Sequence, residues 1–115
     1  MSKYPDPAPD GFLRGVLPKN TNWLGKKFDA LNNMGINVFL ENGKKKNKYK
    51  FKTYKGKSFS DSNLDVLKID YNVSSNPLYL RFLVDELVET KRGEYSGKLY
   101  FRIGGVKLGS FKLKK

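Results

Sequence analysis

The chain of 115 residues contains no cysteine and no histidine. Without cysteine it has neither a disulfide framework nor a thiolate nucleophile. Without histidine it lacks the commonest general base and the commonest metal ligand. The chain has no apolar run long enough to span a membrane and no secretion signal at its start. We therefore expect a cytoplasmic, non-enzymatic protein that uses no cofactor.

Acidic residues are also scarce, with 11 Asp and Glu against 23 Lys and Arg, a formal net charge of +12. The positive charge is concentrated, because eight lysines lie in residues 44–57 and no acid lies in residues 43–59. A local basic strip of this kind indicates a surface that attracts anions.

The length and composition indicate one β-rich domain, since 38% of the residues are hydrophobic and 14% aromatic. Residues 1–11 include Pro5, Pro7 and Pro9, which predicts a flexible, loosely held N-terminal tail. Residues 12–115 then form the domain. Apolar side chains at near-helical spacing in residues 12–17 predict a short helical turn that Pro18 ends.

A β-hairpin is predicted for residues 82–103, with a polar, glycine-containing loop at residues 91–94. In the second arm Tyr95, Leu99 and Phe101 alternate with polar residues, which is typical of a half-buried strand. In the first arm Asp85 and Glu86 are adjacent and must point to opposite faces. At least one of these carboxylates is therefore expected to lie away from bulk solvent.

Further strands are predicted by short apolar or alternating runs with turn signals between them. These runs are a segment starting near Trp23 and residues 36–40, 46–54, 64–73 and 107–114. The short connections favour antiparallel pairing of neighbours in the sequence. We therefore expect an all-β fold, a small antiparallel meander β-barrel of about seven to eight strands.

Two motifs resemble those of small lipocalin-like (calycin-type) proteins with a Gly-x-Trp-x-Gly signature. The first is Thr21-Asn22-Trp23-Leu24-Gly25, in which Thr21 replaces the first glycine. The second joins Asp85-Glu86-Leu87 to Gly93-Glu94-Tyr95-Ser96-Gly97-Lys98. The resemblance covers residues 20–114 and implies a barrel whose interior holds a small apolar ligand. It implies no reaction.

The expectation of a ligand inside the barrel indicates candidate ligand-binding residues. Trp23 either faces a ligand or closes the barrel end, with its ring over Arg102 or Lys112. Tyr and Arg at i and i+2 would share a strand face and bind a carboxylate head group, or else form an ordinary outward polar row. These pairs are Tyr79 with Arg81 and Tyr100 with Arg102, and the wall candidates are Tyr49, Tyr71, Phe82 and Phe101.

The basic strip gives a second hypothesis, an anion-binding adaptor that contacts nucleic acid or anionic membrane through residues 44–57. Strand alternation predicts one basic face, composed of Lys46, Lys48, Lys50 and Lys52. The intervening aromatics would then face the core, so no stacking surface beyond Tyr54 accompanies the lysines. The alternative is a solvated strand face that discourages edge pairing.

A third hypothesis is carboxylate chemistry by the acid cluster of Asp70, Asp85, Glu86 and Glu89. Two facing carboxylates can act as acid and base if their pKa values are separated. The competing interpretation is that a buried carboxylate pairs with Arg81 or Arg102, because an unpaired buried charge is costly.

Overall fold

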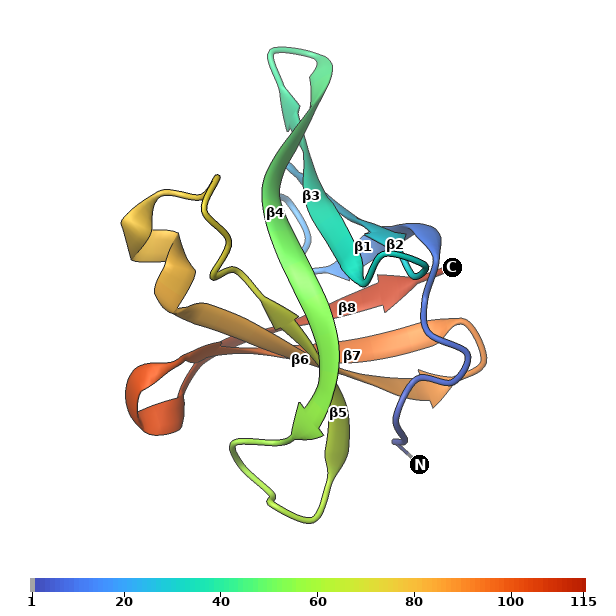
Figure 1. The fold of residues 1–115 in the computed structure, drawn as a ribbon. Helices are drawn as coiled ribbons and strands as arrows, with labels where there is room; N and C mark the ends of the chain where they lie inside the picture. The colour runs from blue at the N-terminus through green and yellow to red at the C-terminus, as the bar shows by residue number, and fades with distance from the viewer. Residues whose placement is uncertain (1) are drawn as a thin grey trace.

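The computed structural model describes residues 2–115 as a closed eight-stranded antiparallel barrel (Figure 1). Each strand pairs with its neighbours in the sequence, and β8 pairs back with β1 to close the barrel. The predicted all-β meander barrel is therefore confirmed. The strands are β1 Gly11–Leu17, β2 Trp23–Asp29, β3 Met34–Glu41, β4 Lys44–Lys57, β5 Asp65–Asp70, β6 Leu83–Lys91, β7 Glu94–Phe101 and β8 Val106–Lys114.

The predicted helical turn at residues 12–17 is wrong, because this segment is strand β1. β1 pairs with both β2 and β8, so a helix here would leave two open sheet edges. Phe12 is exposed and Leu13 is buried, as alternation along a strand requires. Pairing on both sides thus overrides the local apolar spacing.

The predicted loosely held tail is in contact with the barrel. Lys3 and Glu89 exchange backbone hydrogen bonds of 3.0 and 2.8 Å. Pro5 is fully buried, and Tyr4 packs against the core. The segment before β1 therefore extends along the outside of the barrel and adds a short bridge to β6.

The predicted hairpin is confirmed as β6 and β7. Leu87 lies opposite Gly97, and Asp85 lies opposite Leu99. A Cβ at Gly97 would lie 2.1 Å from Cζ of Phe111, so glycine is the residue that admits this ring into the barrel. The hairpin's inward face is thereby continuous with the core.

One end of the barrel is filled by its own side chains. The buried apolar residues there come from all around the sheet, which makes the core continuous. They are Leu13, Phe28, Phe51, Leu67, Ile69, Leu87, Tyr95, Phe111 and Leu113, with Tyr71 at the boundary of the open end.

Two short 3-10 helices, η1 (Leu78–Phe82) and η2 (Ile103–Gly105), flank the β6–β7 hairpin. The extended conformation predicted for Tyr79 and Arg81 is therefore wrong, because both residues lie in η1. Within residues 2–115, the structure contains no helix with the length and apolar character needed to span a membrane.

Candidate functional site

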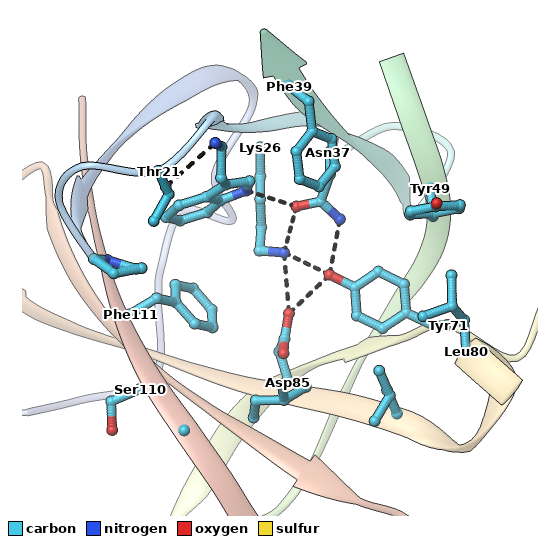
Figure 2. Close-up of a pocket in the computed structure, with 15 residues that line it drawn as sticks. Thr21, Lys26, Asn37, Phe39, Tyr49, Tyr71, Leu80, Asp85, Ser110 and Phe111 are labelled. Carbon is cyan, nitrogen blue, oxygen red and sulfur yellow. Dashed lines mark hydrogen bonds and ion pairs between the residues drawn. The ribbon is translucent and has the colours of Figure 1, made fainter. Parts of the chain in front are cut away.

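The other end of the barrel contains a pocket of about 390 Å³ (Figure 2). This volume is within the range of small-molecule sites. Aromatic and aliphatic side chains form most of its wall, and they come from nearly every strand. The lining residues are Pro18, Thr21, Trp23, Lys26, Asn37, Phe39, Tyr49, Tyr71, Leu80, Leu83, Asp85, Leu99, Gly109, Ser110 and Phe111.

A buried polar cluster lies in the pocket wall, next to the packed core. Lys26 Nζ donates hydrogen bonds of 2.8 Å to Asn37 Oδ1 and 2.5 Å to the Tyr71 hydroxyl. Lys26 Nζ is also 3.0 Å from Asp85 Oδ2, to which the Tyr71 hydroxyl donates at 2.9 Å. Trp23 Nε1 donates to Asn37 Oδ1 at 3.0 Å. Figure 2 shows these side chains converging from β2, β3, β6 and the end of β5.

The ion pair of this cluster, Lys26 with Asp85, is called here the inner pair. Each of the two side chains is 4% exposed. Burial lowers the pKa of Lys26, and the negative charge of Asp85 opposes this effect. Burial raises the pKa of Tyr71 well above its usual value, and Asp85 raises it further. Tyr71 is therefore a neutral hydroxyl at all ordinary pH values and remains a hydrogen-bond donor.

Trp23 lies in the pocket wall. Its ring packs edge-on against Phe111, with 5.8 Å between the ring centroids. A Cβ at Gly15 would lie 2.6 Å from Cζ3 of this ring, so Gly15 makes room for the indole. The predicted cation over the ring is wrong: it is Lys26, whose Nζ is 5.8 Å from the centroid, and not Arg102 or Lys112.

Three of the predicted ligand-binding residues, Trp23, Tyr49 and Tyr71, line the pocket. Phe82 and Phe101 do not. Their rings stack on each other instead, with centroids 5.9 Å apart. Phe82 is the last residue of η1 and Phe101 the last of β7, so both lie at the strand ends beside the pocket and not in its wall.

The predicted Tyr–Arg head-group site does not exist in this structure. Arg102 pairs with the carboxylate of Asp70 on the outside of the barrel. Tyr100 is buried against Phe59, with ring centroids 5.1 Å apart. Arg81 donates from Nε to Asn72 Oδ1 at 2.9 Å. Tyr100 points outward from β7, and Arg102 lies just beyond the end of this strand. Neither side chain lines the pocket.

The Arg102–Asp70 pair confirms the predicted arginine partner for one buried carboxylate. Burial by itself would raise the pKa of Asp70, but hydrogen bonds from Arg102 and Tyr54 bring this pKa below its usual value. The Tyr54 hydroxyl donates to Asp70 Oδ2 at 2.7 Å. Asp70 is therefore an ionised structural group and not a proton donor.

Asp85 and Glu86 point to opposite faces of β6, as predicted, but both pair with lysines and not with arginines. Glu86 pairs with Lys68, which lies directly opposite on β5. This second pair, called here the outer pair, has an Nζ to Oε2 distance of 2.6 Å and side chains 8% and 3% exposed. Glu89, 8% exposed, lies 4.0 Å from Lys3 Nζ. Each carboxylate thus has a cation, and none faces a second carboxylate.

The outer pair is enclosed by the loop between β4 and β5. Glu86 Oε1 accepts a 2.6 Å hydrogen bond from Ser58 Oγ, and Oε2 accepts one of 2.7 Å from the Phe59 backbone N–H. The Lys68 ammonium lies 3.9 Å from the centroid of the Phe59 ring. Both oxygens of Glu86 are therefore occupied, and the pair attaches the loop to the sheet.

The lysines of β4 do not form one face. Lys50 and Lys52 lie opposite Ile36 and Met34, whereas Lys46 lies opposite Phe39, which lines the pocket. A register shift in the intervening segment reverses the alternation, so Lys46 and Lys50 point to opposite sides. Lys48 is paired with Glu41 at 2.7 Å.

The aromatics between these lysines behave as predicted. Phe51 is completely buried in the core, and Tyr49 faces the pocket. Within the basic strip, Tyr54 is then the one exposed aromatic ring on which a nucleic-acid base could stack.

Lys26 and Asn37 are the site residues that sequence reasoning missed. Strict alternation from Trp23 would send Lys26 outward, but a register shift between Trp23 and Gly25 turns it inward. Gly25 has a φ of 146°, and a Cβ there would lie 2.1 Å from the Leu13 carbonyl oxygen. A glycine inside a strand is the one sequence signal for this bulge.

No protein family, curated protein or solved structure matches the chain. The closed barrel is compatible with the calycin-type architecture. The pocket and its polar cluster are the features from which function must be argued.

Proposed function

We propose that this protein binds a small apolar or amphipathic molecule in the open end of its barrel and catalyses no reaction. The observation that carries the proposal is the pocket of about 390 Å³, with apolar walls and one buried polar cluster. Such a combination of apolar body and few convergent polar groups is typical of ligand sites. In the lipocalin-like proteins that the sequence resembles, the corresponding space holds a ligand.

Two features of the wall support uptake of an apolar molecule. Gly109 lies opposite Leu99 on β7, and both residues line the pocket. A Cβ at Gly109 would meet open space, with no heavy atom beyond its chain neighbours within 4 Å, so the wall is open there. The packed core next to the pocket fixes the wall in place, which reduces the conformational entropy lost on binding.

The proposal is tested with N-phenyl-1-naphthylamine, a neutral apolar fluorophore, together with native mass spectrometry of the purified protein. We expect one fluorophore per chain, and native spectra with an additional mass of a few hundred daltons if a ligand is retained. Failure of the fluorophore to bind would contradict the proposal.

Two matched variants each introduce one phenylalanine ring, the first inside the barrel and the second on its outer surface. Gly109→Phe puts it into the pocket, and we expect fluorophore binding to fall at least tenfold while the barrel remains folded. Lys112→Phe puts the same ring on the exposed side of the same strand and should leave binding unchanged. Equal binding by both variants would locate the fluorophore elsewhere.

A second candidate function, anion binding through β4, is favoured by one observation. Lys44, Lys45, Lys46, Lys50 and Lys52 are exposed and make no ion pair with any residue in 2–115. We expect binding of single-stranded DNA or anionic vesicles to weaken steeply with salt. Charge reversal at Lys50 and Lys52 should remove binding if these lysines carry it, and salt-insensitive binding would exclude the adaptor.

A further inference from the structure

The hydrogen-bonding capacity of the polar cluster determines which ligand end group fits the pocket. The argument rests on the proposed binding function and asks which groups of the cluster remain free for a ligand. Donors and acceptors are counted for the five side chains in Figure 2 that the dashed lines connect around Lys26.

Lys26 already interacts with three groups of the cluster. Its Nζ is surrounded by three acceptors, namely Asn37 Oδ1, the Tyr71 oxygen and Asp85 Oδ2. Lys26 donates hydrogen bonds to the Asn37 and Tyr71 oxygens, and its contact with Asp85 Oδ2 is an ion pair of 3.0 Å. A ligand carboxylate would therefore compete with Asp85 for the cation.

Tyr71 and Trp23 are also saturated. The Tyr71 hydroxyl donates to Asp85 and accepts from both Lys26 and Asn37. The single N–H of the Trp23 ring is donated to Asn37 Oδ1. Neither side chain can bind a ligand's polar end without giving up an internal hydrogen bond.

Asp85 retains a free acceptor. Both of its interactions in the cluster end on Oδ2, and Oδ1 accepts no hydrogen bond from residues 2–115. Oδ1 is also not sealed off, because in the described chain the one fully enclosed side-chain polar atom without a partner is the Tyr100 hydroxyl. The Asp85 side chain is 4% exposed and lines the pocket, so Oδ1 is open to the pocket volume.

Asn37 retains one free donor. Its Oδ1 accepts from Trp23 and Lys26, and its Nδ2 donates one hydrogen to Tyr71. The reverse orientation of the amide would place its NH₂ against two donors, so the orientation is fixed. The second hydrogen on Nδ2 has no partner in residues 2–115, and Asn37 lines the pocket.

We propose that the pocket selects a ligand with a neutral hydroxyl end group on an apolar body, an aliphatic alcohol and not a fatty acid. A hydroxyl can donate a hydrogen bond to Asp85 Oδ1 or accept one from Asn37 Nδ2, whereas a carboxylate has no hydrogen to donate. The inner pair has no net charge, so it does not attract a carboxylate. A ligand carboxylate would instead meet the negative oxygen of Asp85, which is the opposite of the arginine-based site that the sequence suggested.

The test compares 1-decanol, decanoate and decyl methyl ether at pH 7, with fluorescence of the single tryptophan, Trp23, as the readout. We expect 1-decanol to bind about tenfold or more tightly than either of the others. The ether has the same apolar body without a donor, so it tests the hydroxyl without any change in the protein. Equal or tighter binding of decanoate or of the ether would overturn the inference.

Asp85→Asn provides the matched variant. It leaves the charge of Lys26 uncompensated, so the preference for 1-decanol over decanoate should fall at least tenfold. Asp65→Asn makes the same chemical change at a partly exposed acid that does not line the pocket, and it should leave the preference unchanged. An unchanged preference in Asp85→Asn would overturn the inference, whereas a pocket that takes up neither these ligands nor the neutral fluorophore would overturn the proposed binding function itself.

Discussion

Two buried lysine–carboxylate pairs lie on opposite faces of one strand, and only one of them is complete. The outer pair, Lys68 and Glu86, has both carboxylate oxygens occupied by a lysine, a serine and a backbone N–H. The inner pair, Lys26 and Asp85, has one oxygen without a partner in the described chain, and that oxygen borders a pocket. The same type of ion pair therefore attaches the β4–β5 loop on one face of β6 and leaves a carboxylate oxygen free to bind a ligand on the other face.

The largest expected difference between the pairs is in stability. Glu86→Gln removes the negative charge from a closed site and leaves Lys68 buried without a counter-charge. We expect the free energy of unfolding to fall by about 3–5 kcal/mol, measured by urea denaturation. Asp85→Asn should cost less, because the pocket beside Lys26 can admit water. Equal losses would show that the two sites are equally closed.

A double variant serves as the control for this measurement. Lys68→Met with Glu86→Leu removes both charges of the outer pair, so no buried charge remains unpaired. We expect it to recover most of the stability lost in Glu86→Gln. A double variant as unstable as the single one would mean that packing of the β4–β5 loop, and not charge, dominates.

Removal of either of two tyrosine hydroxyls should change the free energy of unfolding by a smaller amount, and the two changes should have opposite signs. The Tyr71 hydroxyl, at the inner pair, has three partners, whereas the Tyr100 hydroxyl, near the outer pair, is enclosed without one. Tyr71→Phe should reduce the free energy of unfolding by about 1–3 kcal/mol, and Tyr100→Phe should raise it by up to about 1 kcal/mol. Thermal melts compare the two directly, and a loss of stability in Tyr100→Phe would contradict this description of its hydroxyl.

The smallest expected effect is a pH dependence that comes from the inner pair. Burial lowers the pKa of Lys26 in the folded protein below its value of 10.5 in the unfolded chain. Between the two values the unfolded chain binds more protons, so the free energy of unfolding rises with pH. We expect the stability of the wild type, relative to Lys26→Met, to increase with pH once Lys26 loses its proton in the folded state and below its unfolded value of 10.5. A relative stability that falls over this range would contradict the lowered pKa.

The upper pH limit of that measurement is set by Tyr71. Burial raises its pKa in the folded state, so above its usual pKa of 10.0 the unfolded chain loses this proton first. The free energy of unfolding then falls with pH, which opposes the effect of Lys26. Measurements below this range isolate the lysine.

The fold was largely predictable because alternation and short connections specify an antiparallel meander. The opposite directions of Asp85 and Glu86 also followed from strand geometry alone. The helical turn at residues 12–17 was wrong because pairing of β1 with two other strands is a property of the closed barrel, which local spacing does not contain.

The binding site was less predictable, for two physical reasons. Register shifts in β2 and β4 reverse the alternation, so Lys26 turns inward and the lysines of β4 divide between two faces. The partner of a buried carboxylate also depends on which strands meet across the barrel. Lys26 reaches Asp85 from β2 to β6, a contact that no spacing in the sequence encodes.

The adjacency of Asp85 and Glu86 has a consequence for how the chain finds its fold. A one-residue slip of β6 against its neighbours would exchange the inward and outward sets of side chains. Leu87 or Val84 would then take the place of one carboxylate, and one of the two buried lysines would lose its counter-charge. In either direction a slip of one residue leaves a buried lysine unpaired, and this electrostatic cost favours the native alignment of β6.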